Sequence, residues 1–153
     1  MASLKFLESN INKSTKCIIV NFPHNPTGQL ISKENYEKII KLAKENDIYV
    51  LSDEVYKFLE YNKADRLPSA CDLYEKGISI NLMSKAFGLA GLRIGWIATK
   101  NKALFKKIAS FKNYTTICNS ALSEFFSILA LRNKDKIINR NLDIINKNLN
   151  LLD

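Results

Sequence analysis

Four short apolar runs rich in β-branched residues limit the folds open to this chain more than any other feature. They cover residues 16–22, 48–51, 78–83 and 92–99. Runs of this length and composition are typical of strands that are buried on both faces, as in parallel sheets. A helical pattern separates the first two runs, and this alternation favours an α/β domain with a mostly parallel sheet and flanking helices.

The helix between the first two runs is expected to begin after Ser32. Serine is a favoured N-cap residue because its hydroxyl accepts a hydrogen bond from a free backbone N–H of the first turn. One face of the predicted helix carries four apolar residues, Tyr36, Ile39, Ile40 and Ala43. Such a face is typical of a helix that packs on a core.

The two ends of the chain differ from its centre. Residues 1–15 show no periodicity and are expected to be irregular. The last third carries helical patterns, and apolar residues recur at intervals of three and four between Ile138 and Leu152. This repeat predicts a long amphipathic helix over residues 133–153.

Polar clusters follow three of the apolar runs at the point where each predicted strand ends. Residues 25–28 (Asn-Pro-Thr-Gly) follow the first run, residues 52–56 (Ser-Asp-Glu-Val-Tyr) the second, and Ser84 with Lys85 the third. Parallel α/β sheets bind their ligands at the carboxyl ends of the strands. We therefore expect the three clusters to meet in one site.

The cluster around Lys85 indicates the chemistry. Lys85 follows an apolar run directly, and Gly88, Gly91 and Arg93 come after it. A lysine in that setting is expected to be desolvated, which disfavours the ammonium form and makes the amine a nucleophile for an aldehyde. The planar donors of an arginine suit a phosphate. An aldehyde and a phosphate on one small molecule describe pyridoxal phosphate.

Each of these residues has a commoner role when it is considered alone. Most lysines are surface charges, and an arginine in a strand is more often a salt-bridge partner than a phosphate ligand. Asp53 alone is more typical of a cap or turn at a strand end, and Tyr56 of a packed ring with a solvated hydroxyl. Only the order and spacing of the whole set favour a cofactor site.

Composition narrows the class of protein further. The 153 residues carry a formal net charge of +8, but lysines alternate with glutamates and aromatic residues are not interleaved with the basic ones. This pattern argues against a nucleic-acid partner and suits an anionic cofactor with a carboxylate substrate. No apolar run approaches the ~18 residues that cross a bilayer, so no membrane partner is expected.

The number and spacing of the cysteines indicate the cellular compartment. Cys17, Cys71 and Cys118 are odd in number and form no Cys-x-x-Cys motif. This usage favours a reducing cytosol and excludes a structural zinc site built from cysteines. The first residues also lack the apolar core of a signal peptide. We therefore expect a cytoplasmic protein, and we expect no metal site.

Taken together, the three clusters resemble the aspartate aminotransferase superfamily, the class I and II pyridoxal-phosphate-dependent aminotransferases of fold type I. The resemblance covers about residues 16–132. Because chains of that family are much longer, it implies a central fragment of the large, cofactor-binding domain. Residues 133–153 would then form the long helix that leads into an absent small domain.

The resemblance also implies a role for each site residue. Lys85 would form a Schiff base with the cofactor and later move the substrate's α-proton, and Asp53 would pair with the pyridine nitrogen. Asn25 and Tyr56 would hydrogen-bond the phenolic oxygen of the ring. Arg93 would hold the phosphate.

One position departs from the family pattern. Many members carry serine or threonine three residues before the lysine, where the hydroxyl joins the phosphate site, but Leu82 stands there in this chain. Ser84 is adjacent to the lysine and is retained as a phosphate ligand in its place, although its side chain is expected to point differently.

The function implied is transamination, the transfer of an amino group from an amino acid to a 2-oxo acid, by a homodimeric enzyme in its complete form. The isolated fragment is expected to have low or no activity. Two alternatives stay open. The same residues serve carbon–sulfur lyases of this fold, and the chain could also be a non-catalytic remnant or interaction fragment.

Overall fold

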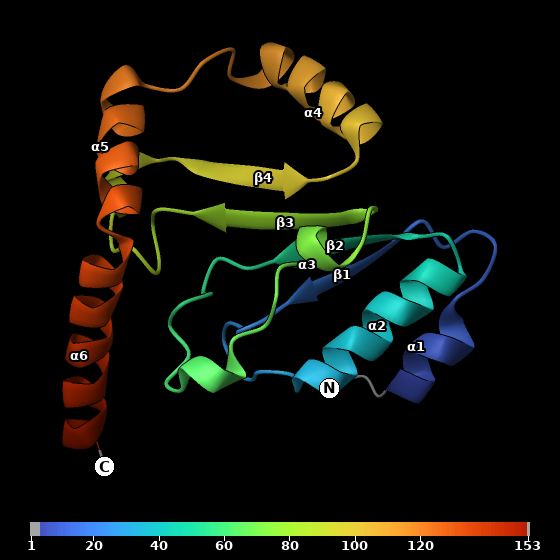
Figure 1. Cartoon of the computed structure of the whole chain (residues 1–153), viewed down its shortest axis with the longest axis horizontal. Helices are drawn as coiled ribbons and strands as arrows, with labels where there is room; N and C mark the ends of the chain where they lie inside the picture. The colour runs from blue at the N-terminus through green and yellow to red at the C-terminus, as the bar shows by residue number, and fades with distance from the viewer. Residues whose placement is uncertain (1–3, 153) are drawn as a thin grey trace.

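A four-stranded sheet forms the centre of the molecule (Figure 1). The computed structural model describes residues 4–152. The strands are β1 (Cys17–Asn21), β2 (Tyr49–Asp53), β3 (Gly77–Leu82) and β4 (Gly95–Thr99), in the order β1-β2-β3-β4. β1, β2 and β3 are parallel, and β4 runs antiparallel to β3. The predicted α/β fold with a mostly parallel sheet is confirmed.

Helices surround this sheet and extend beyond it. They are α1 (Leu4–Asn10), α2 (Lys33–Glu45), α3 (Ala70–Leu73), α4 (Lys102–Thr115), α5 (Ala121–Arg132) and α6 (Lys134–Leu152), with short 3-10 turns η1 (Lys63–Asp65) and η2 (Ala90–Leu92). Figure 1 shows β1 and β3 pointing toward the end of the sheet where α5 and α6 stand. The loops that leave the carboxyl ends of the parallel strands therefore lie on the side of these two helices.

Two expectations about local structure were wrong. Residues 4–10 form α1 rather than an irregular segment, because Leu4 and Leu7 pack against the core in a repeat too short to stand out in the sequence. The last strand begins at Gly95, later than expected from the apolar run, because η2 precedes it and Arg93 adopts a left-handed backbone conformation with φ of 50°.

The helix α2 forms as its sequence predicts. Ser32 is its N-cap, and the Ser32 hydroxyl accepts a hydrogen bond from the Asn35 backbone N–H at 3.2 Å. Glu34 and Lys38 form an ion pair at 2.6 Å on the exposed side. The four apolar residues of the predicted face are all buried.

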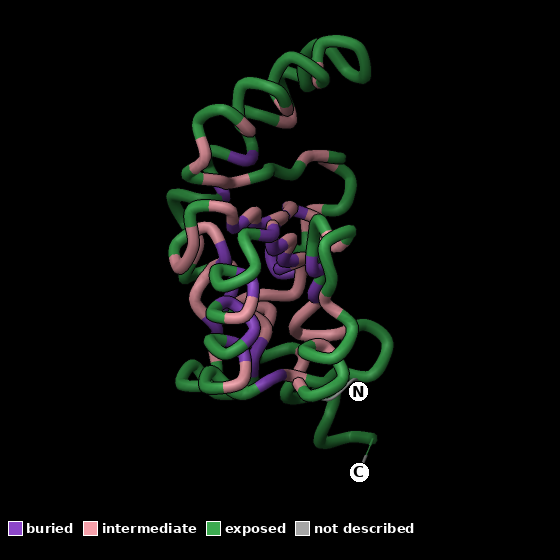
Figure 2. The backbone as a smooth tube through the Cα atoms, turned by 90° about the vertical axis from the view of Figure 1, so that its right-hand side faces the viewer, coloured by how far each residue is buried: buried purple, intermediate pink, exposed green. Residues whose placement is uncertain are grey.

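Buried residues form two hydrophobic clusters around the sheet. Figure 2 shows the buried positions concentrated toward the centre of the molecule. The first cluster lies among α2, β1 and β2 and includes Tyr36, Ile39 and Val50. The second is smaller and lies beneath the loop that carries Lys85. It consists of Met83, Ala86, Phe87, Ala130 and Ile138. The loop after β3 is thus anchored by its own buried residues to α5 and α6.

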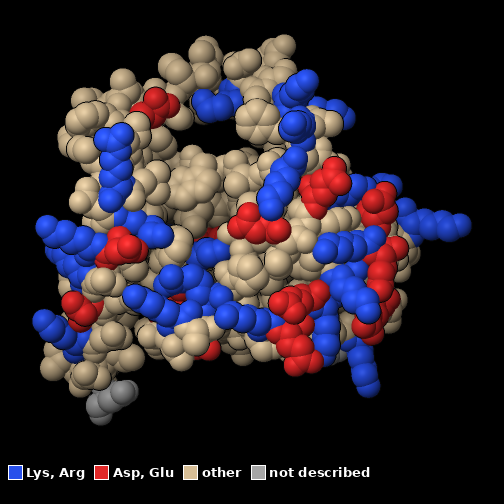
Figure 3. All heavy atoms as spheres, viewed as in Figure 1, with Lys and Arg blue, Asp and Glu red and all other residues tan. Residues whose placement is uncertain are grey.

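The β4 side of the molecule exposes much apolar surface. Trp96 belongs to the apolar run at residues 92–99, which predicts a buried strand, but it is 37% exposed, because α4 stands away from β4 and buries none of its own residues. A hollow lined by Trp96, Ile97 and Phe105 lies between these elements, and Figure 3 shows the opening. Within the described residues, no helix is long and apolar enough to span a membrane.

Tyr36 gives the first core a measurable pH dependence. Its side chain is buried and donates a hydrogen bond to the Ser52 hydroxyl at 3.2 Å. Burial raises the pKa of Tyr36 to about 12, whereas an unfolded tyrosine titrates near ~10. Between these values the native state holds a proton that the unfolded state has lost, so the free energy of unfolding should fall as pH rises through this window.

We expect the Tyr36→Phe variant to lose less free energy of unfolding than the wild type between pH ~10 and ~12. Urea unfolding at a series of pH values measures the slope. Tyr114→Phe is the control, because Tyr114 is 87% exposed. Equal slopes in all three proteins would contradict the expected role of Tyr36.

Candidate active site

The register of the sheet brings the predicted clusters to one edge. Asn21 at the end of β1 pairs with Asp53 at the end of β2, and Asp53 pairs with Ile80 in β3. Because the three strands are parallel, the loops that follow them leave the sheet in the same direction. These loops carry Asn25, Tyr56 and Lys85.

Three side chains from three different loops meet at this edge. The Asn25 Nδ2 donates a hydrogen bond to the Tyr56 hydroxyl at 3.2 Å. The Lys85 Nζ lies 5.6 Å from the centroid of the Tyr56 ring, within the range of a cation–π contact. The structure therefore joins Asn25, Tyr56 and Lys85 into one group, although 31 residues separate the first two.

A cavity of about 430 Å³ adjoins this group. Asn25 and Tyr56 line it together with His24, Leu59 and Ile145 of α6. Its volume is in the range of small-molecule sites. The Tyr56 hydroxyl already accepts a hydrogen from Asn25, so its own hydrogen remains to be donated. The cavity thus offers a phenol and an amide to a polar ligand.

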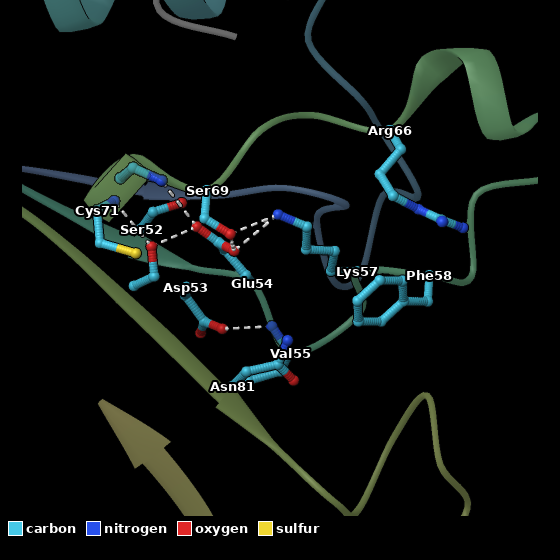
Figure 4. Close-up of polar contacts among 12 residues, drawn as sticks. Ser52, Asp53, Glu54, Val55, Lys57, Phe58, Arg66, Ser69, Cys71 and Asn81 are labelled. Carbon is cyan, nitrogen blue, oxygen red and sulfur yellow. Dashed lines mark hydrogen bonds and ion pairs between the residues drawn. The ribbon is translucent and has the colours of Figure 1, made fainter. Parts of the chain in front are cut away.

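Asp53 and Glu54 are neighbours in sequence whose carboxylates point apart (Figure 4). Asp53 ends β2, is half-buried, and accepts one bond, from the Val55 backbone N–H to Oδ1 at 3.2 Å. Within the part of the chain that the structure describes, the other Asp53 oxygen accepts no hydrogen bond from the protein. A carboxylate in that condition can accept a proton or a hydrogen bond from a ligand.

Glu54 is buried and serves the structure instead. Its carboxylate accepts hydrogen bonds from the Ser69 and Ser79 hydroxyls, both at 2.7 Å, and from the Ala70 backbone N–H at 3.1 Å. It also pairs with the Lys57 ammonium at 3.1 Å. Figure 4 shows these contacts converging. They tie the loop that carries Tyr56 to α3 and β3.

Lys85 itself is exposed, contrary to the expectation that it would be desolvated. The turn after β3 directs Ala86 and Phe87 inward, to 0% and 2% exposure, and leaves the Lys85 side chain outside. The apolar residues around Lys85 in the sequence are buried beneath the loop rather than around its amine. Desolvation by this chain alone therefore does not activate Lys85.

Ser84 and Arg93 lie apart from the Asn25 cavity. Both line the larger hollow of about 660 Å³ beside β4 and α4. Arg93 is exposed and donates one hydrogen bond, from Nη1 to the Ala90 carbonyl at 3.1 Å. Most of its donors thus remain to bind an anion. The expected single site is therefore divided between two cavities, neither of which is lined by Asp53 or Lys85.

Comparisons with known proteins decide the family. A family model described as aminotransferase class I and II matches residues 3–152. This chain belongs to the class I and II aminotransferases. Its sequence is 33% identical over 136 residues to an aspartate aminotransferase of Sulfurisphaera tokodaii, covering 88% of this chain and 34% of that protein. It is 32% identical over 134 residues to aromatic-amino-acid aminotransferase 2 of Thermococcus litoralis, covering 86% of this chain and 34% of that one.

Solved structures of aminotransferases share the fold. A pyridoxal-phosphate-dependent aminotransferase of Streptococcus suis matches with a TM-score of 0.91 and 35% identity, over 98% of this chain and 39% of that one. The aspartate aminotransferase of Thermotoga maritima matches with a TM-score of 0.77 and 28% identity, over 85% of this chain and 35% of that one. This aminotransferase chain spans about a third of the length of the curated relatives it matches.

The donor set of this aminotransferase chain fits pyridoxal phosphate. Lys85 offers an exposed amine, Asp53 a carboxylate oxygen, and Arg93 free guanidinium donors. The Asn25–Tyr56 pair offers a hydroxyl that can donate to a phenolate oxygen. In residues 4–152, no group of three His, Cys, Asp or Glu side chains gathers as metal ligands do. The amine, the carboxylate and the guanidinium are groups that could bind the aldehyde, the ring nitrogen and the phosphate of that cofactor.

Several supporting residues carry no signal in the sequence. Phe58 has a φ of 80°, and the centroid of its ring lies 4.7 Å from the Arg66 guanidinium and 5.1 Å from the Lys134 ammonium. Glu60 is buried and accepts bonds from the Phe58 backbone N–H and from Arg66 Nε. These contacts shape the loop after Tyr56. They join residues far apart in the chain, so no local pattern could predict them.

Proposed function

We propose that this chain is the central part of an aminotransferase that transfers an amino group from an amino acid to a 2-oxo acid, with pyridoxal phosphate as cofactor. The meeting of Asn25, Tyr56 and Lys85 at the carboxyl edge of the sheet carries this proposal. Membership of the class I and II aminotransferases supports it, as do relatives named for aspartate and aromatic amino acids.

The proposed roles follow from the chemistry of each side chain. When bound, pyridoxal phosphate supplies an electron sink for the substrate's α-carbon. Lys85 Nζ would bind the cofactor's aldehyde carbon, and as a free amine it would carry the substrate's α-proton. The free carboxylate oxygen of Asp53 would favour the protonated form of the pyridine nitrogen.

The remaining residues orient the ring and the phosphate. The Tyr56 hydroxyl, which accepts a hydrogen bond from Asn25 at 3.2 Å, would donate to the phenolic oxygen. Arg93 would hold the phosphate through its free guanidinium donors, and Ser84, which lines the same hollow, would add a hydroxyl donor. Leu82 in the preceding strand position has no hydroxyl to offer, which leaves the phosphate with fewer ligands from this chain.

The isolated chain is expected to be a poor enzyme. Because the chain spans about a third of its relatives and Lys85 is exposed, we expect weak cofactor binding and low activity from the 153 residues alone. The division into residues 1–15, 16–132 and 133–153, with the last leading into a small domain, stays a prediction. So does the homodimer.

A single-turnover assay tests the reaction. The chain is mixed with excess pyridoxal phosphate and aspartate, and formation of pyridoxamine phosphate is followed by chromatography. We expect a rate above that of free cofactor in the wild type and in Lys106→Ala, a variant at an exposed lysine. Lys85→Ala should fall to the free-cofactor rate.

The product distinguishes transamination from elimination on the same scaffold. S-Methylcysteine offered in parallel should give pyridoxamine phosphate and the matching 2-oxo acid. Pyruvate, ammonia and a thiol without pyridoxamine phosphate would instead indicate a carbon–sulfur lyase. No Lys85-dependent turnover of either substrate would contradict catalysis by this chain and favour a non-catalytic fragment.

A further inference from the structure

One side chain of α6 reaches into the loop that carries Lys85. The Asn141 Nδ2 donates a hydrogen bond to the Ala86 carbonyl at 2.9 Å, across 55 residues of sequence. Ala86 is 0% exposed and belongs to the cluster beneath the loop. A carbonyl that loses its partner in such a place is costly to leave unpaired. The hydrogen bond from Asn141 is therefore expected to stabilise the loop that carries Lys85.

The Asn141 amide also packs against Gly88. A Cβ placed on Gly88 would lie 3.3 Å from Asn141 Nδ2, and the Gly88 backbone has a φ of +68°. Gly88 N–H in turn donates to the Lys85 carbonyl at 2.9 Å. The amide of Asn141 thus contacts both Ala86 and Gly88, the residues one and three positions after Lys85.

The same helix contacts the other half of the site. At the first residue of α6, the Lys134 ammonium lies 5.1 Å from the Phe58 ring, two residues after Tyr56. One helix therefore holds both loops whose side chains, Tyr56 and Lys85, face each other at 5.6 Å. A shift of α6 relative to either loop would change that separation.

We propose that Asn141 is a positioning residue that fixes the turn at Ala86 and Gly88 and so sets the direction of the Lys85 amine. What Lys85 binds rests on the proposed function, whereas the hold of Asn141 on the turn does not. Asn141 touches neither cofactor nor substrate in this account. It acts through the backbone on either side of Lys85.

Hydrogen exchange of the turn tests this hold without any cofactor. The amides to follow are those of Gly88 and Leu89, which donate to the Lys85 and Met83 carbonyls. We expect both amides to exchange about tenfold faster in Asn141→Leu, which keeps the size of the side chain and removes its hydrogen-bond donor. Asn141→Gln, which keeps an amide donor, should retain most of the protection. Asn148→Leu, at an exposed position on the same helix, is the matched control.

The second readout is the reactivity of Lys85. Each protein is incubated with pyridoxal phosphate, reduced with borohydride and digested, and label at Lys85 is compared with label at exposed Lys106. We expect Asn141→Leu to lower this ratio several-fold at a temperature where circular dichroism shows the variant still folded, and Asn141→Gln to restore it. The visible circular dichroism of bound cofactor should weaken in parallel.

The outcomes separate the two proposals. Unchanged exchange in Asn141→Leu, equal acceleration in the Leu and Gln variants, or faster exchange with an unchanged labelling ratio would each overturn the role of Asn141. A wild type that shows no preference for Lys85 would overturn the proposed function instead. In that case the exchange rates alone decide whether Asn141 holds the turn.

Discussion

Replacing Glu54 with leucine is expected to lower the free energy of unfolding by about 3–5 kcal/mol. The reason is that its carboxylate is the common acceptor for groups from three segments. The Lys57 ammonium, the Ser69 and Ser79 hydroxyls and the Ala70 N–H all donate to it. The side chains of Glu54 and Lys57 are only 6% and 13% exposed, so the variant leaves a nearly buried ammonium without its counter-charge.

Urea unfolding measures this loss of free energy of unfolding, and two further variants are compared with Glu54→Leu. Glu54→Gln keeps the volume and some hydrogen bonds, so we expect a smaller loss than for leucine. Glu34→Leu removes a carboxylate from a solvent-exposed ion pair with Lys38, and its cost should be far smaller than that of Glu54→Leu. Equal losses for Glu54→Leu and Glu34→Leu would contradict the structural role assigned to Glu54.

The Glu54 network also supports the site. It fixes the segment that begins one residue after Asp53 and leads to Tyr56, which accepts the hydrogen bond from Asn25. Glu54 does not face the group formed by Asn25, Tyr56 and Lys85. A mild variant such as Glu54→Gln is therefore expected to affect the site only through the geometry of this loop.

Much of the fold could be predicted because its signals are local. The apolar run at residues 48–51 and the cap at Ser32 each depend on a few neighbouring residues, and β2 and α2 formed where they indicated. The parallel order followed from strand–helix–strand alternation, and with it the common edge of the polar clusters. The family resemblance, carried by these clusters, is confirmed by the family match.

What could not be predicted depends on contacts between distant residues. Lys85 follows a buried strand, yet its exposure is set by a turn that points Ala86 inward. Trp96 lies in an apolar run, yet α4 does not cover it. The bond from Asn141 spans 55 residues and leaves no trace in either segment. The cofactor roles of the site residues remain predictions, because they concern a molecule outside the chain.

The largest functional effect is expected at Lys85, because its amine lies 5.6 Å from the ring of Tyr56, which is hydrogen-bonded to Asn25. Trapping measures it directly. The chain is incubated with pyridoxal phosphate at a concentration high enough for weak binding, reduced with borohydride, and mapped by mass spectrometry. Exposed lysines such as Lys106 react without a binding site and so provide an internal reference. Arg93→Ala should lower the preference by removing the phosphate ligand.

The central claim is that Lys85 is the amine that binds the cofactor's aldehyde, so the distribution of label among lysines tests it most directly. We expect about tenfold or more label at Lys85 than at Lys106. Free inorganic phosphate should reduce this preference, because it competes with the phosphate of the cofactor for Arg93. Label spread evenly over the exposed lysines, with Lys85 no different from Lys106, would contradict it.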